Sequence, residues 1–90
     1  MPEFKRSTRK TSKYMVKTPS GKWVHFGSAL PLMGQYKDST GLGLYSHLDH
    51  NDKQRRKRYL ARAKGIKDKN GNLTKDNPES ANYYSIRYLW

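Results

Sequence analysis

Hydrophobic and polar positions alternate most clearly over residues 13–26. Two extended runs there are separated by a Thr-Pro-Ser-Gly segment, whose residue types favour a tight turn. The alternation predicts a β-hairpin with Tyr14 and Val16 on one face of its first strand. On its second strand, one pair of side chains lies opposite the other: Val24 and Phe26 opposite Trp23 and His25. One aromatic face is expected in the core, and the other is interpreted as packing in preference to a base-stacking surface.

A helical pattern follows Asn51 and Asp52. Residues 53–64 contain no Gly, Pro or β-branched residue, and they are rich in Arg, Lys, Ala and Leu, which have good helix propensity. Asn51 or Asp52 is expected to cap the first turn, and Gly65 to end the helix in the left-handed conformation. Only a thin apolar seam is available to dock this helix on a core, and it comprises Tyr59, Leu60 and Ala63, with Leu48 before them.

The C-terminal segment predicts a second, shorter helix. Asn77 is expected to cap it, with Pro78 at its first position and Glu79 close to the positive end of its dipole. Its apolar side chains are expected to pack on the hairpin, and they are Ala81, Tyr84, Ile86, Tyr88, Leu89 and Trp90. Before this helix, the Asn70-Gly71 pair predicts a tight turn. A short helix or turn is expected near residues 32–36.

The first twelve residues lack such a pattern. They hold four basic residues, one acid and a single large apolar side chain besides Met1, which is too little to bury. We therefore expect residues 1–12 to form a flexible basic arm. Residues 13–90 are expected to form one small α+β domain, in which the hairpin packs with the central basic helix and the C-terminal helix.

Composition adds a strong positive charge to this picture. The 90 residues include 19 Lys and Arg against seven Asp and Glu, which gives a formal net charge of +12. A charge of this size favours association with a polyanion. The central helix in particular would repel itself, because like charges recur at i,i+3 and i,i+4. We expect no membrane partner, since Tyr59 and Leu60 alone do not make the apolar face of a membrane-surface helix.

Two absences narrow the setting. The chain has no cysteine, which excludes disulfides and thiolate metal sites and is compatible with a reducing compartment. No apolar run is long enough for a signal peptide or a membrane span, so an intracellular protein, or one packed in a particle made in a cell, is expected.

The predicted function is non-enzymatic binding of nucleic acid through phosphates, without sequence specificity and without a cofactor. DNA is favoured over RNA. The predicted contacts are the basic side chains of the arm and the helix: Lys5, Arg6, Arg9, Lys10, Lys53, Arg55, Arg56, Lys57, Arg58, Arg62 and Lys64. Arg55 and Arg62 are expected to flank the seam, and the more exposed contacts are expected to be Lys53, Lys57, Arg58 and Lys64.

Possible metal ligands cluster just before the central helix, at His47, Asp49, His50 and Asp52. Two histidines three residues apart can share a helical face, yet the same segment also fits the approach to a helix cap, so no metal site is predicted. Asp49 and His50, with Asn72 and Asn82, loosely match an HNH-like nuclease site. That site needs its histidine on a strand, whereas this one adjoins a helix. A metal-dependent nuclease is kept as an enzymatic alternative.

Three separated strings carry a family resemblance. They are residues 23–27 (WVHFG), residues 41–52 (GLGLYSHLDHND) with Arg55, Arg56 and Tyr59 behind them, and residues 80–90 (SANYYSIRYLW). Together they resemble a family of small basic proteins encoded by large double-stranded DNA viruses of eukaryotes, the nucleocytoplasmic large DNA viruses. The resemblance assigns no activity and no catalytic residue. It implies a viral protein, found in the host cytoplasm or nucleus during infection and packaged in the virion with DNA or beneath the capsid. A minor structural protein that bridges acidic surfaces of larger capsid or core proteins is the alternative function.

Overall fold

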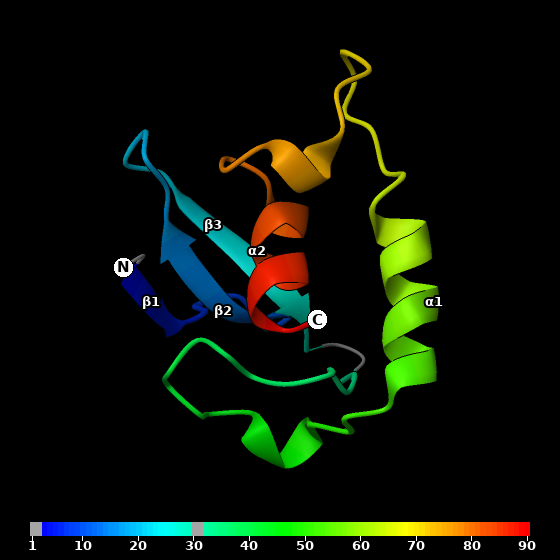
Figure 1. The fold of residues 1–90 in the computed structure, drawn as a ribbon. Coiled ribbons are helices and arrows are strands. Elements are labelled where there is room, and N and C mark those ends of the chain that lie inside the picture. Colours follow the sequence, from blue (N-terminus) through cyan, green and yellow to red (C-terminus); the bar gives the residue numbers. More distant parts are fainter. Residues whose placement is uncertain (1–2, 30–31) are drawn as a thin grey trace.

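An antiparallel sheet of three strands is covered on one face by a short helix, and a longer helix stands beside them (Figure 1). The computed structural model describes residues 3–29 and 32–90. The elements are β1 (Glu3–Arg6), β2 (Ser12–Lys17), β3 (Trp23–Ser28), the 3-10 helix η1 (Ser46–Leu48), α1 (Lys53–Ala63), the 3-10 helix η2 (Thr74–Asp76) and α2 (Ala81–Tyr88). The sheet order is β1-β2-β3. This architecture confirms the predicted α+β class.

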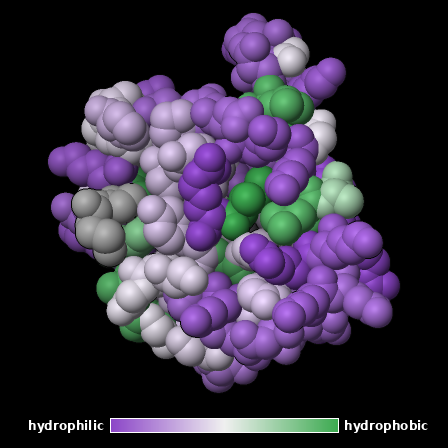
Figure 2. All heavy atoms as spheres, in the orientation of Figure 1, coloured by the Kyte–Doolittle hydropathy of each residue, from purple (hydrophilic) through white to green (hydrophobic). Residues whose placement is uncertain are grey.

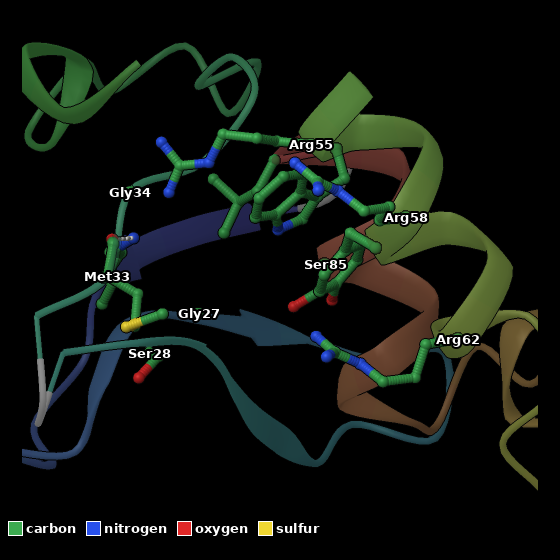
Figure 3. Close-up of a pocket in the computed structure, with 12 residues that line it drawn as sticks. Gly27, Ser28, Met33, Gly34, Arg55, Arg58, Arg62 and Ser85 are labelled. Carbon is green, nitrogen blue, oxygen red and sulfur yellow. Dashed lines mark hydrogen bonds between the residues drawn. The ribbon is translucent and has the colours of Figure 1, made fainter. Parts of the chain in front are cut away.

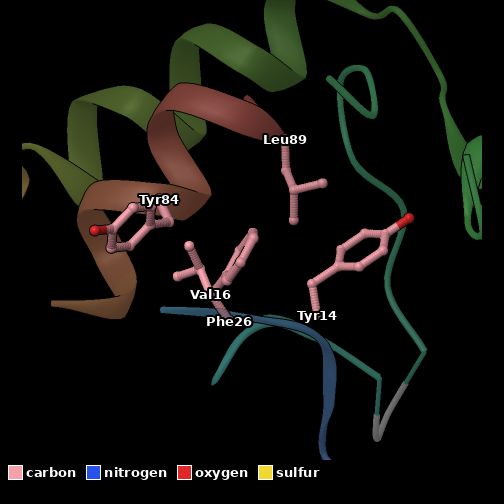
Figure 4. Close-up of a cluster of buried hydrophobic side chains, with 5 residues drawn as sticks. All are labelled: Tyr14, Val16, Phe26, Tyr84 and Leu89. Atoms are coloured by element: carbon pink, nitrogen blue, oxygen red, sulfur yellow. The ribbon is translucent and has the colours of Figure 1, made fainter. Parts of the chain in front are cut away.

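The predicted hairpin is formed by β2 and β3, and one of its two aromatic faces lies in the core, as predicted. Tyr14 pairs with Phe26 and Val16 with Val24, so the alternate positions of both strands share one face. Figure 4 shows this face meeting two side chains near the end of the chain. The buried cluster comprises Tyr14, Val16, Phe26, Tyr84 and Leu89. The opposite face is more open, since Trp23 is exposed.

The prediction of a flexible arm over residues 1–12 is wrong for Glu3–Arg6, which form β1 and pair with β2. Met1 and Pro2 lie outside the described residues. Phe4 supplies the packing, because its ring meets Tyr88 edge-on at a centroid distance of 4.6 Å. The backbone ladder with β2 is a further attachment, which an alternation pattern of apolar side chains does not reveal.

Helix α1 begins where the sequence indicates but ends differently. The Asp52 carboxylate accepts the amides of Gln54 and Arg55 at 3.0 and 3.2 Å, which confirms it as the N-cap. The prediction of a left-handed Gly65 is wrong, because Gly65 is not among the positive-φ residues. The amide of Gly65 instead bonds the carbonyl of Arg62 at 3.3 Å, so the helix tightens into a 3-10-like turn.

Helix α2 begins at Ala81 and is capped by the hydroxyl of Ser80, so the predicted start at Asn77 is wrong. The Asn77 side chain accepts the Glu79 amide at 2.9 Å and forms a turn ahead of the helix. Glu79 does not serve the helix dipole, because its carboxylate accepts the hydroxyl of Thr18 in the β2–β3 turn at 2.6 Å. These contacts fix the entry to α2 against the hairpin.

The long segment between β3 and α1 is organised by side chains and short bridges. No helix forms near residues 32–36, because Gln35 makes a β-bridge with Asp49. The buried side-chain amide of Gln35 donates to the carbonyl of Tyr45 at 2.7 Å and to Asp49 at 2.6 Å. By contrast, the predicted Asn-Gly turn is confirmed, with Gly71 at a φ of 82°.

Candidate nucleic-acid interface

Helix α1 is attached to the domain along one side. The ring of Tyr59 stacks on Trp90, with centroids 4.2 Å apart, and Ala63 is buried. Arg56 adds a hydrogen bond of 2.7 Å from its Nε to the backbone oxygen of Trp90. The predicted docking seam is thus confirmed for Tyr59 and Ala63, while Leu60 is only half-buried.

A groove separates α1 from the rest of the domain (Figure 3). Its volume is about 640 Å³, and its walls come from α1, from the end of β3, from the loop at Met33 and Gly34, and from the end of α2. Four cationic side chains line it, and no Asp or Glu of the described residues does: Lys13, Arg55, Arg58 and Arg62. Tyr59 and Trp90 supply partly exposed apolar surface, with the buried Leu89 next to them. The groove therefore combines positive charge with an apolar floor.

Helix α1 presents two different basic faces. The groove face consists of Arg55, Arg58 and Arg62. The outer face lines a shallow depression of about 380 Å³ and carries Lys53, Arg56, Lys57 and Lys64. Arg56 is already engaged, since its guanidinium lies 4.8 Å from the ring centroid of Tyr36 as well as on Trp90. The uncommitted cations of the outer face are therefore all lysines.

The charge of α1 is not neutralised within the described chain. Six of its eleven residues are Lys or Arg, and none is acidic. Among residues 3–29 and 32–90, the only salt bridges join Lys5 to Glu3 and Lys75 to Asp76. Figure 2 shows hydrophilic residues over most of the visible face, around a small hydrophobic area. Like charges on successive turns thus repel one another, and within the described residues no salt bridge offsets this repulsion.

Arg58 and Lys13 are the two departures from the predicted site. Arg58 is exposed, as predicted, but it lies one turn from both Arg55 and Arg62 and lines the groove with them, not the outer face with Lys53, Lys57 and Lys64. Lys13 was not among the predicted contacts. It is only 1% exposed, and its Nζ donates a hydrogen bond to Gln35 Oε1 at 2.6 Å.

Burial explains the chemistry of Lys13. It lowers the pKa of the ammonium to about 8, and the carboxylates of Asp38 and Asp49 oppose that shift. The sequence contains one signal for the burial of Lys13, namely Gly27 in the second strand of the hairpin. A glycine within a strand often marks a place where another part of the chain approaches the backbone closely. Gly27 has a φ of +80°, and a Cβ there would lie 3.1 Å from the Cβ of Lys13.

The basic residues predicted on the arm are not brought to α1. Lys5 and Arg6 lie on β1, which is on the far side of the sheet from α1 in Figure 1. The Lys5 ammonium stands 5.1 Å from the ring centroid of Trp23. Arg9 and Lys10 are exposed between β1 and β2. These four cations therefore lie away from the basic faces of α1.

The His/Asp cluster before α1 is held by internal contacts. Asp49 accepts the amide of Asp38 at 2.9 Å besides the Gln35 side chain, and Asp52 caps the helix. His50 Nδ1 accepts the Asp52 amide at 2.9 Å, and burial lowers the pKa of its imidazole. Within the described ranges, no group of three or more His, Asp or Glu is placed to hold a metal ion.

Comparisons with protein-family models, with curated proteins and with solved structures each found no match. In the described part of the chain, no helix has the length and apolarity needed to cross a bilayer. Fold and surface together define a small α+β domain that carries an exposed basic helix beside a groove.

Proposed function

We propose that this protein binds nucleic acid, with DNA preferred to RNA, through phosphate contacts along α1 and without reading sequence. The observation that carries the proposal is the exposed, unneutralised charge of this helix. A polyanion relieves the repulsion between its turns and releases condensed counterions, which makes binding favourable at moderate salt.

The character of the outer face supports binding without sequence specificity. Lys53, Lys57 and Lys64 carry compact charges on flexible stems, which suit phosphates in many positions. Phosphate contacts fix position but carry no sequence information. The chain also has no recognised base-reading motif.

The viral resemblance of residues 13–90 supplies the biological setting of the proposal. In that setting the protein acts without catalysis, is packaged in the virion, and neutralises part of the charge of the genome. The alternative, a bridge between acidic surfaces of larger virion proteins, uses the same helix with carboxylates in place of phosphates.

Fluorescence anisotropy with two unrelated duplexes of about 20 base pairs tests the proposal, across salt from about 50 to 300 mM. We expect equal affinity for both sequences within about twofold, and a log-log salt slope of about −4 or steeper. A polyglutamate competitor separates the alternatives. Binding of polyglutamate without retention of either duplex at low salt would support the protein-bridging function instead.

A further inference from the structure

We propose that the groove beside α1 binds a segment of single-stranded nucleic acid, while duplex DNA is held by the outer face. This inference rests on the proposed function, because it assigns the two faces of the same helix to two forms of one ligand. Four cations line the groove, of which the three arginines are exposed and Lys13 is buried, and no Asp or Glu among the described residues lines it. Its charge therefore selects an anionic occupant.

The two faces differ in the chemistry of their cations. The groove face contains only arginines, whereas the uncommitted cations of the outer face are lysines. A guanidinium offers a planar fork that binds phosphate through two parallel hydrogen bonds and also stacks on flat rings. A nucleic-acid single strand that places both a phosphate and an unpaired base in the groove can use both the phosphate-binding fork and the stacking surface of a guanidinium.

The floor of the groove suits unpaired bases. Tyr59 and Trp90, which are both partly exposed, line it, and Met33 closes one side with half of its surface exposed, whereas Leu89 is only 1% exposed and offers no surface to a base. Single-stranded nucleic acid exposes the faces of its bases, which pack on aromatic and apolar side chains, whereas a duplex keeps them stacked inside. A volume of about 640 Å³ falls within the range of pockets that hold molecules the size of a nucleotide.

Access to the groove also favours a single strand. Its arginines extend toward a second wall formed by Gly27, Met33 and Gly34 (Figure 3). A duplex takes an α-helix into a major groove about 12 Å wide, which requires the contacting helix face to be free. The groove face is not free in this sense, but a single chain can enter between the walls. From Arg55 to Arg62 the helix rises about 10 Å, enough to reach more than one phosphate of a strand.

Two triple variants of equal charge change test the assignment. The groove variant is Arg55→Ala, Arg58→Ala and Arg62→Ala, and the outer variant is Lys53→Ala, Lys57→Ala and Lys64→Ala. We expect the groove variant to weaken binding of a single strand of about 12 nucleotides by about tenfold or more, but duplex binding by about threefold or less. The outer variant should show the reverse preference. Equal losses for both ligands in both variants would overturn the proposal.

A charge-preserving variant separates guanidinium chemistry from charge. Arg55→Lys, Arg58→Lys and Arg62→Lys together should retain duplex binding and weaken single-strand binding severalfold. Unchanged single-strand affinity would contradict the role of the arginine forks. Circular dichroism of every variant confirms that the helices are intact.

Tryptophan fluorescence gives a readout that does not depend on affinity. With Trp23→Phe, Trp90 is the sole tryptophan and reports from the groove. A saturating single strand should change its emission, and a saturating duplex should not. An unchanged signal with the single strand, or displacement of that strand by polyglutamate of equal charge, would overturn the proposal. If the proposed function itself were wrong, the result would differ from these outcomes, because the unmodified protein would then show no salt-dependent binding to either the duplex or the single strand.

Discussion

The ring of Tyr59 lies nearly parallel to the indole of Trp90, with ring centroids 4.2 Å apart and planes inclined by 12°. This stack joins the middle of α1 to the residues that follow α2. Ala63, one turn further along, is the only fully buried residue of α1. The position of the basic helix, and with it the width of the groove, therefore depends on a small number of apolar contacts.

Tyr59→Ala should lower the free energy of unfolding by about 2 to 3 kcal/mol, because it removes the stack and leaves a partly buried cavity. Tyr59→Phe is the control, since it keeps the ring and should cost less than about 1 kcal/mol. Urea denaturation followed by circular dichroism measures both. Equal stability of the two variants would show that the stack does not hold α1.

Stability should rise between about pH 8 and pH 10 because of Lys13. Burial lowers the pKa of its ammonium to about 8 in the folded protein, so the unfolded chain binds more protons in this range. Tyr14 sets the upper end of this pH range. Its pKa is raised to about 12 in the folded protein, so its contribution to the free energy of unfolding falls as the pH rises above 10.

Lys13→Met is the test of this dependence. Urea denaturation at several pH values should give a rising free energy of unfolding for the unmodified protein and a flatter profile for the variant. A rise of the same size in Lys13→Met would assign the effect to another group.

Gly27→Ala should destabilise the protein more than Gly21→Ala. Both glycines have positive φ, of 80° and 86°, so each alanine carries the strain of the left-handed region, about 1 to 2 kcal/mol. At Gly27 the added Cβ also lies 3.0 Å from Leu89 Cδ1, whereas nothing lies within 4 Å at Gly21. Thermal unfolding compares the pair, and equal losses would contradict the close approach at Gly27.

Part of the free energy of unfolding should be lost below about pH 4.5 because of Glu79. Hydrogen bonds from Ser20 and Thr18 lower the pKa of its carboxyl below the ordinary 4.5. A lowered carboxyl pKa stabilises the fold above the ordinary value, and this contribution is lost as the pH falls through the folded value. Glu79→Gln should therefore lose less stability than the unmodified protein on acidification below pH 4.5, as measured by urea denaturation.

Local patterns in the sequence were enough to predict the hairpin and the start of α1. Alternation separated Val24 and Phe26 from Trp23 and His25 without deciding which face is core, and Asn51 or Asp52 marked the first turn of the helix. Strand β1 was missed, because Phe4 is its only large apolar side chain and its backbone pairing leaves no periodic signal.

The groove was not predictable in the same way. Its walls come from α1 and from segments far apart in the chain, at Lys13, Gly27, Met33 and Leu89, and only the tertiary fold brings these together. The pattern on α1 grouped Arg58 with Lys53, Lys57 and Lys64, whereas the fold turns Arg58 toward the groove. The predicted phosphate contacts on α1 stay a prediction, but the structure divides them between two faces.

The salt dependence of duplex binding tests the central claim most directly. The outer variant Lys53→Ala, Lys57→Ala and Lys64→Ala is compared with a control of equal charge change on exposed lysines outside α1, Lys17→Ala, Lys22→Ala and Lys69→Ala. Each lost phosphate contact should make the log-log slope shallower by about 0.9, or about 2.7 for three. We expect this change in the outer variant and an unchanged slope in the control. Equal slopes in the two variants would contradict phosphate binding by α1.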